Sequence, residues 1–406
     1  MMTKKQARFF AFFVLMLTGV FAGLFWLNSR IVVNKDDIAR SLHTQKWSKK
    51  PPEKLVLETQ NKTLVAQANY TFDDTLTQDI EKLFKSYNPD YGAFVAIDAS
   101  TGRVLALIDH NPEDPWIQDH LALRATFPSA SVFKVVTAAA AIAERKLHSG
   151  TLVSYNGRAH TLYKNHLFKE SINRWTNHVT LKHAFAHSVN TVFGKLGVFN
   201  VGPVALKSYA QKFGFDRKIN SDLPLQEGRA GITEDPWELA EAASGFTRTN
   251  TMSPLQGALI AAAIVNDGIM MEPFAVDSLK TDEGKTIYQA QPKISETVID
   301  IQSATEMKEL MRETVESGTS RGSFKGFFKS RFKNIDVGGK TGSLTGTDPE
   351  GKYDWFVGYA SFHKNDTEVK IAIAALTISK EYWKVKSSYI ARRAIESYFS
   401  KQEKQN

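Results

Sequence analysis

Ser131 and Lys134 lie three residues apart and could supply a nucleophile and its base. In a helix, side chains at i and i+3 lie on the same face, about 5–6 Å apart, so an amine can take the proton of a hydroxyl. A lysine can act as this base when burial or a nearby cation lowers its pKa. The alanine-rich apolar stretch 132–143 predicts a buried helix that would supply the burial. The pair therefore indicates covalent acyl-transfer chemistry.

The same Ser-x-x-Lys spacing occurs twice more, at Ser330 to Lys333 and at Ser361 to Lys364. Only Ser131 is predicted at the start of a long buried helix, where free backbone N–H groups favour developing negative charge. The other two matches lie in sequence typical of strands or of the surface. Ser131 and Lys134 are therefore the predicted catalytic pair.

Ser188 and Asn190 form a Ser-x-Asn pair, a spacing that also occurs after Ser86, Ser154 and Ser171. Apolar residues on both sides of Ser188, in 181–185 and 192–196, would bury a helical hinge around the polar pair. The alternative is that Ser188 only caps a helix.

Lys340, Thr341, Gly342 and Ser343 follow one another on a predicted strand, and this Lys-Thr-Gly motif occurs once. A cation, two hydroxyls and a glycine that permits close approach could line a groove for a carboxylate and a peptide backbone. The order Ser-x-x-Lys, Ser-x-Asn, Lys-Thr-Gly is typical of active-site serine enzymes that transfer acyl groups from D-alanyl peptides or β-lactams.

The elements that must position these residues follow from the apolar pattern. Short β-prone runs at 93–96 and 104–108, separated by turn residues, predict a hairpin. Helical sequence with glycine and proline punctuation covers about 180–265 and predicts a helical lobe. Further strands are predicted at 335–342, 355–362 and 369–378, before a closing helix at about 389–399. The predicted fold class is α/β, with strands from both ends of the chain in one antiparallel sheet flanked by helices.

Composition limits the other functions. The chain has 406 residues, no cysteine and a formal net charge of +8. Thiolate catalysis, disulfides and Cys-ligated zinc are therefore excluded. No motif for nucleic-acid binding accompanies the basic charge, so nucleic acid is not a predicted partner. His178, His183 and His187 lack the HExxH context of a metal site, and neither a metal nor a cofactor is predicted.

The segment 9–27 is apolar throughout and is close to the ~20 residues that a membrane-spanning helix needs. Lys4, Lys5 and Arg8 precede it, which places residues 1–8 in the cytoplasm and everything after residue 27 outside. The alternative is a signal peptide, but no small-x-small cleavage site follows. The predicted domains are a cytoplasmic tail (1–8), an anchor (9–27), a basic and polar tether (28–75), a catalytic domain (76–400) and a tail (401–406).

From about residue 90 to 398 the chain resembles the penicillin-binding transpeptidases of bacterial cell-wall synthesis. Beyond the three motifs, similar segments are 91–107, 180–197, the Thr-x-x-Pro-Leu-Gln sequence 251–256, and 355–359. The resemblance implies the penicillin-binding and serine β-lactamase fold. It also implies stem peptides of peptidoglycan and β-lactams as ligands, and a single-pass protein of the bacterial inner membrane with its domain in the periplasm. Other cell-wall synthesis proteins are expected partners.

The same resemblance implies a role for each motif residue. Ser131 would attack the carbonyl of a terminal D-Ala-D-Ala, and Lys134 would take its proton. Ser188 and Lys340 would relay that proton to the leaving amine, and Asn190 would hold the substrate amide. The backbone N–H groups of Ser131 and Ser343 would form the oxyanion hole, and the hydroxyls of Thr341 and Ser343 would bind the substrate carboxylate.

Two features differ from the family pattern. Ser343 stands where many relatives have threonine, which keeps the hydroxyl. Residues 28–75 can hold neither an intact glycan-polymerising domain nor a large pedestal domain, so the chain is expected to be like class B members that lack the pedestal. The segment 317–323 is expected to form a loop beside the groove.

Three related functions stay open: a D-Ala-D-Ala carboxypeptidase, a β-lactamase and a β-lactam sensor without turnover. The Glu-x-x-Leu-Asn loop of class A β-lactamases would follow Ser188, whereas the nearest similar sequence, 170–173, precedes it. Class D enzymes usually have Ser-x-Val where this chain has Ser188 and Asn190. The short N-terminal tail leaves little room for a signalling output.

Overall fold

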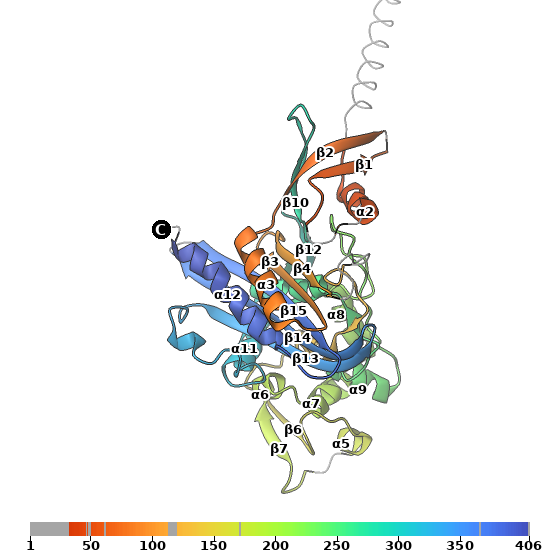
Figure 1. The fold of residues 1–406 in the computed structure, drawn as a ribbon. Coiled ribbons are helices and arrows are strands. Elements are labelled where there is room, and N and C mark those ends of the chain that lie inside the picture. Colours follow the sequence, from red (N-terminus) through yellow and green to blue (C-terminus); the bar gives the residue numbers. More distant parts are fainter. Residues whose placement is uncertain are drawn as a thin grey trace, which may run out of the picture.

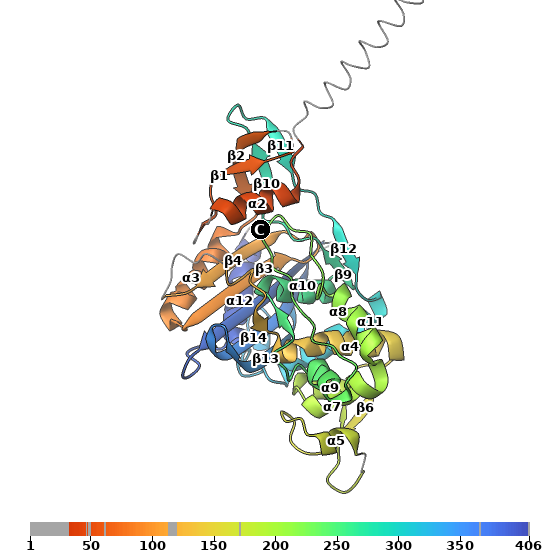
Figure 2. The ribbon, with the colours of Figure 1, turned by 90° about the vertical axis from the view of Figure 1, so that its right-hand side faces the viewer.

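A computed structural model describes residues 32–404 except 46, 48, 49, 61, 113–119, 170, 171, 365 and 366. Figures 1 and 2 show it from two sides. The predicted anchor, 9–27, and the tail before it lie outside the described residues. Within the described part, no helix is long and apolar enough to cross a membrane.

The centre of the fold is an antiparallel sheet of five strands in the order β13-β14-β15-β3-β4. The strands are β3 (Tyr91–Asp98), β4 (Val104–His110), β13 (Asp336–Thr347), β14 (Glu350–Lys364) and β15 (Thr367–Ser379). Apolar runs in β3 and β15 are buried on both faces, as expected for central strands covered by helices. Since β15 pairs with β3, strands from both ends of the chain share this sheet, as predicted.

Helices cover both faces of this sheet (Figure 1). On one face, α12 (Ser387–Lys404) packs against β14 and β15, and α3 (Asp74–Tyr87) packs against β4 and α12. These helices and strands enclose a phenylalanine-rich core. On the other face, α10 (Pro254–Val265) is completely buried between the sheet and the helical lobe. The strand β13 lies at the edge of the sheet, so one of its sides is open to the lobe.

The predicted helical lobe is present beside β13. Its helices are α4 (Lys134–Arg145), α6 (Leu181–Ala186), α7 (Asn190–Lys195), α8 (Pro203–Lys212), α9 (Pro236–Ser244) and α11 (Ile301–Glu316). Side-chain caps start several of them: Asp235 accepts hydrogen bonds from two backbone N–H groups of α9, and Asp300 accepts one from Ser303 in α11. The hairpin of β6 (Leu152–Tyr155) and β7 (Asn177–Thr180), with α5 (Lys164–Phe168), forms the outer end of the lobe (Figure 2).

The segment predicted as a tether, 28–75, is folded over most of its described residues. It forms α2 (Lys35–Gln45), β1 (Lys54–Glu58) and β2 (Thr63–Tyr70), which lie at the end of the molecule opposite β6 (Figure 1). The strands join β10 (Val276–Lys280) and β11 (Thr286–Gln289) in a sheet with the order β1-β2-β10-β11. Alternating burial in β1, with Leu55 and Leu57 inside, stabilises this small sheet against α2. The prediction of a tether was wrong here because it was based on the prolines and charged residues beside β1 and not on the alternation of apolar residues within the strand.

Candidate active site

Ser131 lies in a single 3₁₀ turn, η1 (Ala130–Phe133), which leads directly into α4. The turn is set by Ala130, whose φ of 48° lies in the left-handed region that alanine rarely adopts. Such strained residues persist where the surrounding structure fixes them, often at functional sites. The predicted position of Ser131 at the start of a buried helix is thus confirmed, since every residue of α4 from Lys134 to Ile142 is buried.

Lys134 is completely buried, and its amine contacts three oxygen atoms. The Nζ atom lies 2.9 Å from Ser131 Oγ, 2.7 Å from Asn190 Oδ1 and 2.5 Å from the carbonyl oxygen of Ser244. Burial, and secondly the charge of Lys340, hold the pKa of Lys134 well below its ordinary value of 10.5. Burial therefore favours the neutral form of this amine.

A neutral amine has two N–H bonds and one lone pair. The Asn190 and Ser244 oxygens can only accept hydrogen bonds, so they take the two N–H groups of Lys134. The lone pair is then directed at Ser131 Oγ, the only one of the three partners that carries a proton. In this geometry the amine of Lys134 can accept the proton of Ser131 Oγ.

Asn190 starts α7, and its amide orientation is fixed from two sides. Its Nδ2 donates to the carbonyl oxygen of His160 at 3.0 Å, so its Oδ1 faces Lys134. Its backbone N–H donates to the carbonyl oxygen of Ala159 at 2.7 Å. Asn190 of the Ser-x-Asn motif therefore links the segment that contains Ala159 and His160 to Lys134.

Ser188 and Lys340 form a second hydroxyl–amine pair. Lys340 Nζ lies 3.1 Å from Ser188 Oγ and 2.9 Å from the carbonyl oxygen of Thr341. Burial lowers the pKa of Lys340 to about 7. Near neutral pH this lysine therefore exchanges a proton readily. Ser188 lies between α6 and α7, and its φ of 57° is in the left-handed region that residues other than glycine rarely adopt.

The edge strand β13 closes one side of the site. A Cβ atom at Gly342 would lie 3.2–3.3 Å from Ser129, Ala130 and Val132, so glycine permits β13 to approach η1 closely. The indole Nε1 of Trp355, on β14, donates to the carbonyl oxygen of Pro128 at 2.9 Å and fixes the segment before η1 to the sheet.

The three motifs meet at one cavity of about 590 Å³. The motif residues that line it are Ser131, Ser188, Asn190, Thr341, Gly342 and Ser343, while Lys134 and Lys340 lie buried beneath. The expected loop also borders it, since Thr319 Oγ1 lies 2.5 Å from Thr341 Oγ1. Gly322 and Ser323 of the same loop line it as well. Further lining residues that were not predicted are His160, Gly245, Phe246, Asp354, Lys386 and Ser388. No local motif marks them, because they come from four separate segments.

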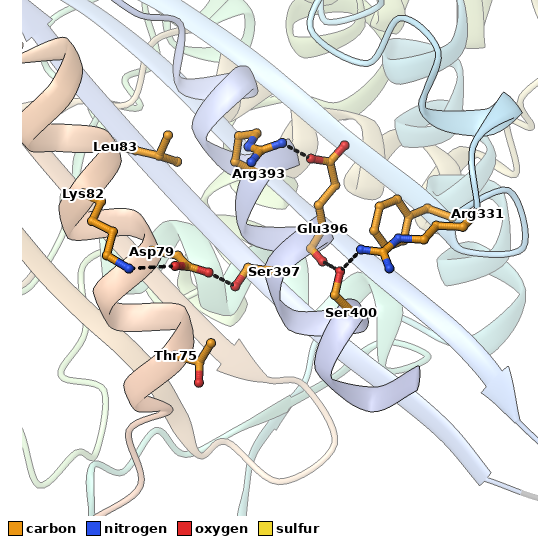
Figure 3. Close-up of a pocket in the computed structure, with 10 residues that line it drawn as sticks. Thr75, Asp79, Lys82, Leu83, Arg331, Arg393, Glu396, Ser397 and Ser400 are labelled. Atoms are coloured by element: carbon orange, nitrogen blue, oxygen red, sulfur yellow. Dashed lines mark hydrogen bonds and ion pairs between the residues drawn. The ribbon is translucent and has the colours of Figure 1, made fainter. Parts of the chain in front are cut away.

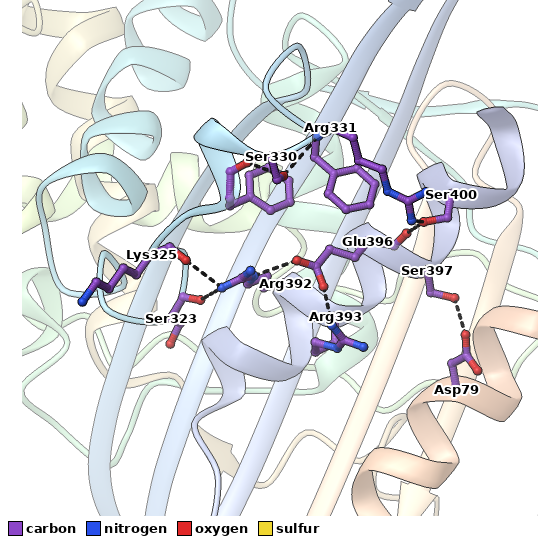
Figure 4. Close-up of polar contacts among 12 residues, drawn as sticks. Asp79, Ser323, Lys325, Ser330, Arg331, Arg392, Arg393, Glu396, Ser397 and Ser400 are labelled. Atoms are coloured by element: carbon purple, nitrogen blue, oxygen red, sulfur yellow. Dashed lines mark hydrogen bonds and ion pairs between the residues drawn. The ribbon is translucent and has the colours of Figure 1, made fainter.

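The two other Ser-x-x-Lys matches lie elsewhere. Ser330 follows the turn η3 (Phe327–Lys329), and its Oγ donates to the carbonyl oxygen of Phe327 at 2.6 Å (Figure 4). Ser361 is buried on β14, opposite Asp336 and Lys370 of the neighbouring strands. Neither serine stands at the start of a helix.

A larger groove of about 740 Å³ lies between α3 and α12, away from the three motifs (Figure 3). Its charged groups pair with each other: Asp79 accepts from Ser397 at 2.7 Å and lies 3.5 Å from Lys82, and Arg393 donates to Glu396 at 2.7 Å. No residue of the three motifs lines this groove.

Among the described residues, no three His, Cys, Asp or Glu side chains are grouped so as to hold a metal ion. His183 and His187 do meet, with ring centroids 4.2 Å apart. Burial, followed by the charge of His183, lowers the pKa of His187.

Comparison with protein families matches residues 92–395 to the model described as the penicillin binding protein transpeptidase domain. The chain belongs to this family. The matched range contains all three motifs and all five strands of the central sheet except the first residue of β3.

Among curated proteins, the chain is 30% identical over 325 residues to the peptidoglycan D,D-transpeptidase PbpA of Mycolicibacterium smegmatis, covering 71% of this chain and 62% of that protein. It is also 30% identical to PbpA of Mycobacterium tuberculosis, again over 71% of this chain and 62% of the relative. The chain thus spans about three fifths of the length of these relatives.

Solved structures share the fold. The D,D-transpeptidase domain of a peptidoglycan glycosyltransferase from Eggerthella lenta matches with a TM-score of 0.67 and 25% identity, over 83% of this chain and 84% of that one. Penicillin-binding protein A of M. tuberculosis in its penicillin G acyl-enzyme complex matches with a TM-score of 0.62 and 25% identity, over 82% and 81% of the two chains.

Proposed function

We propose that this protein is a peptidoglycan D,D-transpeptidase that forms an acyl-enzyme at Ser131 with D-Ala-D-Ala stem peptides and is acylated by β-lactams. The observation that carries this proposal is the buried Lys134 amine, whose Nζ lies 2.9 Å from Ser131 Oγ. The names of the curated relatives support the reaction, and the penicillin G complex of a similar structure supports the inhibitor class.

Acylation starts when Ser131 Oγ attacks the carbonyl carbon of the penultimate D-alanine while its proton passes to Lys134. The backbone N–H groups of Ser131 and Ser343, which come from η1 and β13, would stabilise the oxyanion. The intermediate then collapses with cleavage of the C–N bond. The leaving nitrogen receives the proton held by Lys134 through Ser188 and Lys340, whose Oγ and Nζ atoms are 3.1 Å apart. D-alanine then departs, and Lys134 is neutral again.

In the second half-reaction, an acceptor amine attacks the ester carbonyl and transfers a proton to Lys134. The ester C–O bond then breaks, and Ser131 Oγ takes this proton from Lys134. Water in place of the amine would make the enzyme a carboxypeptidase. No glutamate lines the cavity in the described part of the chain, and its one carboxylate, Asp354, is held by the backbone N–H of Ser387 at 2.7 Å. This arrangement supports slow hydrolysis and argues against a β-lactamase.

We also propose that the chain is anchored by residues 9–27 in the bacterial cytoplasmic membrane, with residues after 27 outside the cytoplasm. The support is the apolar length of this segment and the basic residues before it. Protease added to spheroplasts should remove the folded domain. Recovery of a soluble mature form that starts after residue 27 would contradict this anchor.

The experiment for the reaction is mass analysis of products after incubation with a pentapeptide donor, with and without an amine acceptor. A transpeptidase gives a product that contains the acceptor, whereas a carboxypeptidase gives only the tetrapeptide. Intact mass after a penicillin chase separates the other candidates. Loss of the adduct within seconds, with release of penicilloate, identifies a β-lactamase. A stable adduct without any peptide turnover identifies a sensor.

A further inference from the structure

The active-site cavity extends past the Lys-Thr-Gly motif toward the start of α12. Beyond Ser343, its wall is formed by Asp354 on β14 and by Lys386 and Ser388, which flank the first residue of α12. Asp354 is the partner of Ser343 in the register of β13 and β14. Directly opposed residues on neighbouring strands have Cβ atoms about 4.5–5.5 Å apart, so Asp354 lies immediately beside the motif.

Lys386 is held at this wall by two contacts. Its Nζ lies 3.3 Å from Asp354 Oδ1 and 2.9 Å from the centre of the Trp383 ring. Its side chain is 43% exposed, whereas that of Asp354 is 8% exposed and is also fixed by the backbone N–H of Ser387. The ammonium is therefore both anchored and accessible from the cavity.

Lys386 is the only lysine or arginine among the described residues that line the cavity. Lys134 and Lys340 lie beneath its surface, and burial lowers the pKa of each. The accessible positive charge of the cavity is therefore that of Lys386. Its partner Asp354 is paired with Ser343 across β13 and β14, and paired residues share one face of a sheet, so Lys386 lies on the face that carries the Ser343 hydroxyl. Thr341, two residues before Ser343 on β13, points to the same face.

We propose that Lys386 binds the C-terminal carboxylate of the donor peptide, and the equivalent carboxylate of a β-lactam, together with the hydroxyls of Thr341 and Ser343. This inference rests on the proposed function and adds a specificity-determining residue to it. An ammonium beside two hydroxyl donors favours a carboxylate through charge-assisted hydrogen bonds, whereas a neutral amide or ester gains little from the charge. The four-carbon side chain of lysine is flexible, so the ammonium can approach the ligand while it stays close to the Asp354 carboxylate.

The test compares acylation of Ser131 by penicillin G, which carries one carboxylate, with acylation by its neutral methyl ester. Rate constants come from intact-mass time courses of the full chain. Lys386→Met should lower the rate constant for penicillin G about tenfold and leave that for the ester unchanged. Lys386→Arg should restore the preference for the carboxylate. Lys384→Met is the matched control, because Lys384 pairs with Asp90 at 3.1 Å and does not line the cavity.

Asp354→Asn is a second variant, and it should change the preference for penicillin G over its ester in the opposite direction to Lys386→Met. It removes the negative charge beside Lys386 while an amide oxygen still accepts from Ser387, so the preference for penicillin G over its ester should rise about two- to threefold. Equal losses for both compounds in Lys386→Met, or no loss for either, would overturn the role of Lys386. Wild-type protein that neither compound acylates would instead overturn the proposed function.

Discussion

Two tetrapeptides of the same pattern, Ser131 to Lys134 and Ser330 to Lys333, have different surroundings in this molecule. The first begins a buried helix, and its amine is enclosed by three oxygen atoms. The second lies in a basic turn near α12, where the Ser330 hydroxyl bonds to its own turn and Lys333 is exposed. The Ser-x-x-Lys pattern can therefore supply a nucleophile and a base only where burial lowers the pKa of the lysine.

The largest expected difference between the two tetrapeptides is in covalent labelling. Ser131→Ala should abolish the penicillin adduct, because it removes the atom that forms the ester. Ser330→Ala and Ser361→Ala should label like the wild type. Intact mass after incubation with penicillin measures all three. A persisting adduct in a folded Ser131→Ala variant would place the nucleophile elsewhere.

The lysines should differ nearly as much. Lys134→Met should lower the acylation rate by roughly 10²- to 10⁴-fold, the usual contribution of a general base, while Lys333→Met should leave it unchanged. Since burial holds the pKa of Lys134 well below 10.5, acylation by the wild type should already be fast far below that pH. A rate that rises only near pH 10 in intact protein would exclude Lys134 as the base.

The buried active-site lysines and the exposed Lys333 should also differ in how they make the free energy of unfolding depend on pH. Lys340, beside Ser188, is the buried lysine of this comparison. Folded Lys340 has a pKa of about 7, while an unfolded lysine holds its proton up to about 10.5, so unfolding takes up a proton between these values. The free energy of unfolding should therefore rise with pH in this window, by at most about 1.4 kcal/mol per pH unit for one such group. Denaturant titrations at pH 7 and 9 should show a smaller rise for Lys340→Met and an unchanged rise for Lys333→Met.

The smallest expected effect on the acylation rate concerns Arg392, which links α12 to the segment that runs from the active-site cavity to the turn around Ser330. Arg392 on α12 donates to the carbonyl oxygens of Ser323 and Lys325 at 3.0 and 3.1 Å and is held by Glu396 (Figure 4). Because Ser323 lines the active-site cavity, Arg392→Ala should loosen this wall and lower acylation roughly two- to tenfold.

Arg393 provides the matched control for this link. Its guanidinium pairs with the same Glu396 but lines the groove between α3 and α12 (Figure 3). Arg393→Ala should therefore leave the acylation rate within a factor of two. Equal rates for the two variants would show that the loop does not depend on Arg392.

Much of the fold and of the motif geometry could be predicted because local patterns encode it. The apolar runs of the central strands and the alanine-rich helix after Ser131 were recognised from sequence, and the structure brings the three motifs to one cavity. The lining residues His160, Asp354 and Lys386 were not recognised, since each reaches the cavity only through pairing of distant segments. The small sheet of β1, β2, β10 and β11 escaped prediction for the same reason.

That small sheet has a consequence for biosynthesis. Asn69 of β2 bonds to Ser278 of β10, 209 residues later in the chain. A hairpin of β1 and β2 alone is marginally stable in water, so these strands are stabilised only after β10 has been made and has paired with β2. An early part of the described chain is thus among the last to be fixed in place.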